Sequence, residues 1–290
     1  MRHLRISAIS FLNTAPLMWD FEHGDAGRNF DISYTVPSRC ALQLHEGSAD
    51  IGIIPAAAYA TIPDLSILPG VAIASKQAVR SILLVSKVPL EKAKTVALDT
   101  SSLTSVALTK VLFAKWWGGA KNYTSMKPEL ETMLAENDAA LLIGDPALRV
   151  DRSKYLTFDL AEEWMRLTRK PFVFAFWAVR RKALVEADFH GDLAHIFQQS
   201  RDHGLEPQNL EIISEEWSPR VKLSKEDVRD YLTENIHYSL DAACINGMQM
   251  FFHYAAECGA LPASPELDFL THCGAQILRS ELDLLRFRRR

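Results

Sequence analysis

Two apolar stretches far apart in the chain decide the fold, RSILLVS at residues 80–86 and PFVFAFWAV at residues 171–179. Each is a short, continuous apolar run, which is typical of a strand buried on both faces. Between them lies a separate series of strands and helices, so the two runs suit a chain that crosses into an inserted lobe and returns. We therefore expect a first lobe of residues 1–86 and 177–290, an inserted lobe of residues 87–176 and a ligand cleft between them.

The segments around these runs alternate between strand and helix patterns. Further strands are predicted at residues 4–12, 32–36, 51–54, 95–98 and 139–143, with helical patterns near residues 14–21, 38–47 and 103–117. Thr14 and Ser38 are the predicted caps of the first two helices. From residue 182 onward the chain has helical patterns, broken near residues 204–207 and 261–262. The fold class is therefore α/β, with two lobes, two crossover strands, parallel connections and a helical C-terminal tail.

The composition excludes several classes of protein. A chain of 290 residues with 48% hydrophobic residues is long enough for about two packed domains. The formal net charge of −4 predicts no nucleic-acid partner, and the basic cluster at residues 286–290 is typical of a solvated helix end. No run approaches the roughly 20 apolar residues that span a bilayer, and the start lacks a signal-peptide pattern. We expect a cytoplasmic protein without membrane insertion; the oligomeric state stays open.

The cysteines predict neither disulfides nor a metal site. All four are widely scattered, which is typical of reduced thiols in a cytoplasmic protein. A zinc site formed by Cys258, His272 and Cys273 would lack a CxxC pair, so we expect no metal.

Small polar side chains recur where a predicted strand ends and a helix begins. In an open α/β sheet such ends face the ligand crevice, and helix N-termini there attract anions. Arg80 adds one cation that can grip a carboxylate. A small anion, with two carboxylates, fits this set, although each Ser or Thr taken alone is an ordinary helix cap. The candidate binding residues are Asn13, Thr14, Ser38, Arg80, Ser81, Ser102, Thr104, Ser105 and Asp145.

The familiar catalytic motifs are missing. The chain has no glycine-rich phosphate loop, no G-x-S-x-G elbow and no H-E-x-x-H motif. Asp99 and Asp145 stand at strand ends and are candidate acids or bases, while Asp145 before Pro146 equally fits a turn or an N-cap. We expect chemistry that depends on orientation and charge placement.

Several blocks together resemble the MqnA family, the chorismate dehydratases of the futalosine route to menaquinone. They are SFLNTAPL (10–17), VPSRCA (36–41), DIGIIP (50–55), VRSILLVSKVPL (79–90), ALDTSSLTS (97–105), LLIGDPAL (141–148) and PFVFA (171–175). The resemblance implies the two-lobed fold of type II periplasmic solute-binding proteins, recruited as a cytosolic enzyme. It also implies a hydro-lyase that converts chorismate, a dicarboxylate, into 3-(1-carboxyvinyloxy)benzoate and water without metal or organic cofactor.

The motif positions imply roles for single residues. Asn13 matches the family's signature asparagine; because an amide is no base at neutral pH, it is expected to hydrogen-bond a carboxylate or the leaving hydroxyl. Ser81 is the second expected catalytic residue, beside Arg80 at the start of the first crossing strand. Thr104 and Ser105 are expected to hold a carboxylate from the inserted lobe. Since the matching motifs contain no His or Lys, the substrate's own enolpyruvyl carboxylate is the hypothetical base.

Three other functions stay open. The first is a non-catalytic binding protein for a small dicarboxylate, and the missing signal peptide weighs against it. The second is the paralogous dihydroxynaphthoate synthase, which opens with a different motif and uses a histidine in the inserted lobe. No histidine occurs here between His45 and His190. The third, a ligand-sensing domain of a regulator, lacks a DNA-binding helix pair.

Overall fold

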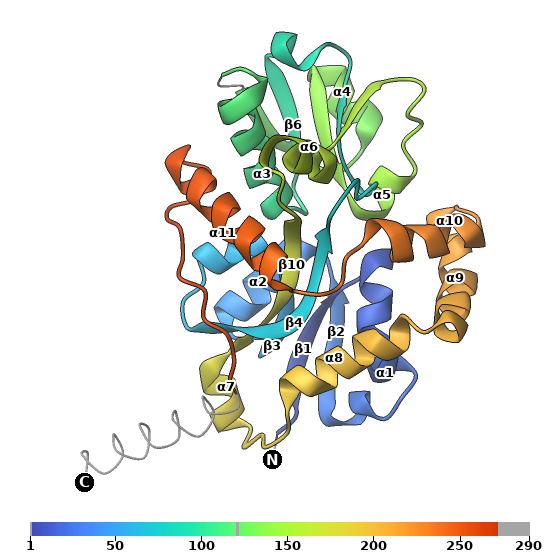
Figure 1. The fold of residues 1–290 in the computed structure, drawn as a ribbon, viewed down its shortest axis with the longest axis vertical. Helices are drawn as coiled ribbons and strands as arrows, with labels where there is room; N and C mark the ends of the chain where they lie inside the picture. The colour runs from blue at the N-terminus through green and yellow to red at the C-terminus, as the bar shows by residue number, and fades with distance from the viewer. Residues whose placement is uncertain (1, 120–121, 272–290) are drawn as a thin grey trace.

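The chain folds around two five-stranded sheets. The structure, a computed structural model, describes residues 2–119 and 122–271; His272, Cys273 and the basic cluster at 286–290 lie outside this part. The first sheet has the order β2 (Phe30–Thr35), β1 (Leu4–Ile9), β3 (Ile51–Pro55), β10 (Phe172–Arg180), β4 (Leu65–Ser75). The second has the order β7 (Asn122–Met126), β6 (Thr95–Asp99), β8 (Ala139–Ile143), β5 (Ile82–Ser86), β9 (Leu156–Asp159). Figure 1 shows the second sheet above the first, which gives the expected two lobes.

Each sheet has a parallel half and an antiparallel half. β1 runs parallel to β2 and β3, and β6 runs parallel to β7 and β8, as the alternating pattern predicts. The two apolar crossing runs pair antiparallel: β10 with β3 and β4, and β5 with β8 and β9. The expectation of parallel connections therefore holds only outside these two strands.

The strand pairing in the two sheets indicates the boundary between the lobes. A division at residues 86 and 177 assigns β5 to the first lobe and splits β10, whereas β5 pairs entirely within the second sheet and β10 within the first. We therefore propose that the chain crosses between the lobes at residues 76–81 and again at residues 169–171.

Short helices connect the strands. In the first lobe they are η1 (Leu12–Met18), α1 (Trp19–Glu22), η2 (Ala26–Asn29), α2 (Pro37–Glu46) and η3 (Ala56–Ala60). In the second they are η4 (Leu90–Lys92), α3 (Thr104–Leu112), η5 (Phe113–Trp117), α4 (Leu130–Glu136), α5 (Gly144–Leu148) and α6 (Leu160–Thr168).

The C-terminal part is helical up to residue 257. It contains α7 (Arg181–Glu186), α8 (Leu193–Gly204), α9 (Pro207–Val221), α10 (Lys225–Asp230), η6 (Tyr231–Asn235) and α11 (Ala242–Glu257). Residues 258–271 correct the expected helical tail, because they form no helix. Near the end of this segment, the Leu270 amide donates to the Ile67 carbonyl of β4 at 2.8 Å. In the described chain each helix is too short or too polar to cross a membrane.

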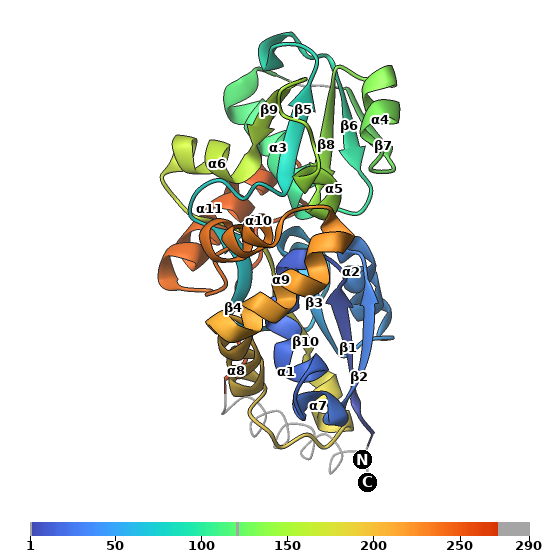
Figure 2. The same ribbon diagram turned by 90° about the vertical axis from the view of Figure 1, so that its right-hand side faces the viewer.

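One hydrophobic core continues through both lobes. The ring of Phe251 on α11 packs 5.0 Å from Phe172 on β10 and 6.4 Å from Trp164 on α6. The same buried cluster includes Leu108 of α3 and Leu4 of β1. Figures 1 and 2 show α10, α11 and the segment between them at the waist of the molecule, between the two sheets. The C-terminal region therefore contributes to the place where the lobes meet.

Candidate active site

A cavity lies between the lobes, where the strands of both sheets end. Its empty volume is about 420 Å³, open mouth included. It is lined by the ends of β1, β3 and β8, by the starts of α2, α3 and α5, and by β4, β5 and β10. The lining residues are Ile9, Phe11, Asn13, Pro37, Pro55, Ile73, Ile82, Ser102, Thr104, Ser105, Ile143, Gly144, Phe174 and Ala175. This is the expected crevice at the carboxyl ends of strands.

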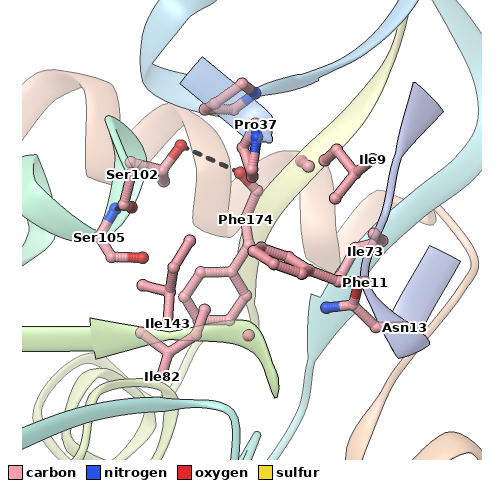
Figure 3. Close-up of a pocket in the computed structure, with 14 residues that line it drawn as sticks. Ile9, Phe11, Asn13, Pro37, Ile73, Ile82, Ser102, Ser105, Ile143 and Phe174 are labelled. Atoms are coloured by element: carbon pink, nitrogen blue, oxygen red, sulfur yellow. Dashed lines mark hydrogen bonds between the residues drawn. The ribbon is translucent and has the colours of Figure 1, made fainter. Parts of the chain in front are cut away.

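The cavity combines apolar walls with neutral polar groups. Figure 3 shows Asn13 on one side of the Phe11 and Phe174 rings, with Ser102 and Ser105 on the other. None of the described residues that line the cavity carries an ionisable side chain. Flat aromatic walls suit a ring, and hydroxyl and amide groups suit its polar substituents.

Asn13 is placed by the first short helix. Thr14 does not cap this helix as predicted, because η1 already begins at Leu12, with Phe11 at the cap position and no side-chain cap bond. Instead the Thr14 hydroxyl donates to Asn13 Oδ1 at 3.4 Å. That contact directs the other end of the amide, its NH₂ group, toward other partners.

The start of α3 forms the opposite wall. The Ser105 amide donates to Ser102 Oγ at 3.1 Å, so Ser102 satisfies one free amide of the first turn. The Thr104 hydroxyl donates to the Phe174 carbonyl at 3.0 Å and accepts from the Ala57 amide at 3.1 Å. The one hydroxyl proton of Thr104 is thus donated to the other lobe, whereas Ser105 Oγ is directed toward the cavity in Figure 3.

Ser81 and Arg80 stand behind the cavity wall and do not line it. Ser81 is fully buried, and its hydroxyl accepts from the Tyr231 hydroxyl at 2.8 Å. Arg80 has a positive φ of 62°, and its amide donates to Asp159 Oδ2 at 2.6 Å. Its guanidinium lies 3.8 Å from Asp227 at the surface. In this structure the guanidinium is therefore directed away from the cavity.

Ser38 and Asp145 also lie outside the lining residues. Ser38 is not the predicted helix cap, because α2 begins one residue earlier, at Pro37, after Val36. Its amide instead donates to the Ser101 carbonyl of the other lobe at 3.1 Å. Asp145 accepts a hydrogen bond from the Leu12 amide at 3.2 Å, again between the lobes. Burial raises the pKa of Asp145 above its usual range, and the Leu12 amide opposes that rise.

The second candidate acid, Asp99, holds a loop together. Its carboxylate accepts from the Ser101 amide at 2.8 Å and from the Ile143 amide at 3.2 Å. Burial raises the pKa of Asp99, and these hydrogen bonds oppose the rise. Both carboxylate oxygens of Asp99 bond to amides of its own lobe, so these structural contacts explain its position without a catalytic role.

Sequence reasoning missed Phe11, Phe174 and Tyr231. The sequence pattern places Phe174 in a buried strand. Because that strand passes the cavity between the lobes, some of its side chains must line the cavity. Tyr231 lies in a region without motifs, and no pattern in the sequence singles it out. Its position follows only from the return of the C-terminal helices to the waist.

One group of described residues has the composition of a metal site, namely His237, Asp241 and Cys244. Asp241 caps α11 through the Cys244 amide at 2.8 Å, and the Lys76 ammonium lies 2.8 Å from its other oxygen. Helix capping and this ion pair account for the arrangement, and a metal cation would have to displace Lys76.

Comparisons with known proteins agree with the sequence motifs. A family model described as menaquinone biosynthesis matches residues 4–257. A curated relative, the chorismate dehydratase of Thermus thermophilus, is 29% identical over 288 residues, which cover 91% of this chain and 98% of the relative.

Solved structures share the two-lobed architecture. A protein from Archaeoglobus fulgidus matches with a TM-score of 0.66 and 15% identity, covering 89% of this chain and 98% of that one. The periplasmic aliphatic sulphonate binding protein of Escherichia coli matches with a TM-score of 0.62 and 17% identity, covering 91% and 95%. At these identities the likeness concerns the fold alone, and it confirms the expected periplasmic-binding-protein-like class.

Proposed function

This chain belongs to the menaquinone biosynthesis family, and from that premise we propose that it is a chorismate dehydratase. The reaction removes water from chorismate and gives 3-(1-carboxyvinyloxy)benzoate, as the resemblance to the futalosine-route enzymes implies. The observation that carries the proposal is the similarity to the Thermus thermophilus chorismate dehydratase along 91% of this chain. The resemblance to cytosolic enzymes likewise supports a cytoplasmic location.

The chemistry of the cavity is compatible with this substrate. Chorismate has a partly unsaturated ring, which becomes flat in the aromatic product, and two carboxylates; the cavity offers the rings of Phe11 and Phe174 with neutral donors on both sides. Two helices, α2 and α3, begin at its wall, and their partial positive ends favour a carboxylate.

The reaction makes modest demands on acid and base groups. The C3–H bond breaks, its electron pair forms a ring double bond, and the C4–O bond breaks as the hydroxyl leaves. The departing oxygen takes a proton and becomes water, and the new aromatic ring makes the step strongly downhill. Because none of the described lining residues is ionisable, the substrate's enolpyruvyl carboxylate is the favoured acceptor of the C3 proton.

The proposed roles follow the wall on which each residue stands. Asn13 donates to the leaving hydroxyl or to a carboxylate, with Thr14 holding the Asn13 amide. Ser81 does not line the cavity, so its proposed part in catalysis acts through the neighbouring residues that do, Ile82 and Gly144. Ser102 and Ser105 bind a carboxylate at the start of α3, and Thr104 fixes that helix to the first lobe. Three further residues affect binding indirectly, through contacts at the waist where the lobes meet, because none of them lines the cavity: Arg80, Ser38 and Asp145.

Incubation of the purified protein with chorismate tests the proposal. Chorismate absorbance should fall while the aromatic product appears in equal amount by chromatography. A protein that binds chorismate without turnover would instead be a dicarboxylate-binding protein, the other function compatible with this fold.

A further inference from the structure

A tyrosine from the C-terminal region lies between the two expected catalytic residues. Tyr231 begins η6, directly after α10, and is 1% exposed. Its hydroxyl donates to Ser81 Oγ at 2.8 Å, across 150 residues of sequence. Burial raises the pKa of Tyr231, and the neighbouring side chains of Ser81 and Asn13 oppose that rise. The charges of Asp145 and Arg80 also act on this group, raising and lowering that pKa respectively.

The number of hydroxyl protons fixes the direction of hydrogen bonding from Tyr231 through Ser81. A serine hydroxyl has one proton and two acceptor sites, so a Ser81 oxygen that accepts from Tyr231 has its own proton to donate elsewhere. Ser81 lies next to Ile82, and its backbone carbonyl accepts from the Gly144 amide at 2.8 Å; both Ile82 and Gly144 line the cavity.

A second tyrosine nearby lacks this arrangement. Tyr238 is also buried, 4% exposed, and its hydroxyl has no hydrogen-bond partner among the described residues. The two side chains are close enough for the charge of one to act on the pKa of the other. The chain therefore provides a matched pair of buried tyrosines: the hydroxyl of Tyr231 is hydrogen-bonded to Ser81, and that of Tyr238 has no partner among the described residues.

We propose that Tyr231 is a positioning residue for the dehydration: by holding the Ser81 hydroxyl behind the cavity wall, it fixes the part of that wall beside which Asn13 donates toward the bound substrate. The inference rests on the proposed function. Burial keeps the Tyr231 phenol protonated at neutral pH, as a donor to Ser81 requires.

Two variants that each lose one hydroxyl test the role. Tyr231→Phe should lower kcat for chorismate by about 10- to 100-fold while KM changes less than about threefold, because the lost contact orients donors to the transition state. Tyr238→Phe should leave kcat and KM within about twofold of wild type. Thermal unfolding of both variants checks that the core stays packed. An active wild type whose Tyr231→Phe variant keeps its kcat would overturn the inference, whereas an inactive wild type would overturn the proposed function itself.

A double-mutant cycle separates positioning from a merely structural role. Because Tyr231 acts partly through Ser81, Tyr231→Phe should cost markedly less in a Ser81→Ala background than in wild type. Equal losses in both backgrounds would contradict action through Ser81. If Tyr231→Phe does not fold, 3-fluorotyrosine at this position retains a more acidic hydroxyl. Because its phenol still donates to Ser81, that protein should keep kcat within about threefold of wild type at neutral pH, and a loss of tenfold or more would count against the role.

Discussion

The Asp145 carboxylate accepts a hydrogen bond from the Leu12 amide at 3.2 Å and so joins the start of α5 in one lobe to the start of η1 in the other. Next to it, Gly144 meets the Phe11 ring between the same two elements. Each lobe therefore helps to hold the cavity wall of the other.

The first prediction concerns Asp145 and pH. Burial raises the pKa of this carboxyl in the folded protein. Its favourable contribution is therefore present below the unfolded-state pKa of about 4 and is lost as pH rises through the folded-state pKa. In Asp145→Asn the amide oxygen still accepts from Leu12 and no charge is buried. The variant should be more stable than wild type at pH 7, and the difference should shrink toward pH 4 in urea titrations; a less stable variant at pH 7 would contradict this.

The same variant tests the base. If the substrate's carboxylate takes the C3 proton, Asp145→Asn should lower kcat by less than about tenfold. A loss of about 10²–10⁴-fold, which is typical of a missing general base, would assign the proton to Asp145.

Asn13→Ala should lower kcat by about 10²–10³-fold, because it removes a donor placed against developing charge. Asn209→Ala is the matched control: its amide donates to the His203 carbonyl at 2.8 Å, away from the cavity, and its loss should leave turnover unchanged. Steady-state kinetics on both proteins decides the point, and equal activities would remove Asn13 from the site.

Gly144→Ala should disturb both folding and substrate binding. Gly144 has a φ of +62°, and a Cβ there would lie 2.8 Å from the Phe11 ring. Gly259, at φ +67°, has nothing within 4 Å, so Gly259→Ala measures the backbone cost alone, about 1 kcal/mol. The free energy of unfolding of Gly144→Ala should fall by about 2–4 kcal/mol, and KM for chorismate should rise. If the two variants are equally stable, the Phe11 contact is unimportant.

Thr104→Val should destabilise the protein by about 2–4 kcal/mol. The valine leaves the Phe174 carbonyl and the Ala57 amide without their buried partner, and each such loss costs about 1–3 kcal/mol. Thr104→Ser keeps the hydroxyl and should recover most of this free energy in urea unfolding. A valine variant as stable as the serine variant would show that water replaces both contacts.

The sequence patterns predict the interior of both sheets well and their edges poorly. β4, β7 and β9 were not predicted, and each is an edge strand. β4 contains Pro69 and Gly70, which normally mark a turn and are tolerated here because an edge strand needs fewer ladder hydrogen bonds. β7, with the sequence NYTSM, is largely exposed and has no apolar face to reveal it.

In the candidate site, too, some residues are predictable from local sequence patterns and others are not. Asn13, Ser102, Thr104 and Ser105 lie where a strand gives way to a helix, so local order alone predicts their common crevice. Tyr231 reaches Ser81 only through long-range packing, which local patterns do not encode. The Thr104 hydroxyl was expected to hold substrate, and only the structure reveals its use between the lobes.

The position of β10 between β3 and β4 has a consequence for biosynthesis. As the nascent chain leaves the ribosome, four of the five strands of the first sheet emerge by residue 75, but β10, which joins β3 to β4, is complete only at residue 180. The second sheet, spanning residues 82–159, is complete earlier and is free to fold while the first still has two unpaired edges. The second sheet, which is synthesised later than β1 to β4, is thus complete before the first sheet.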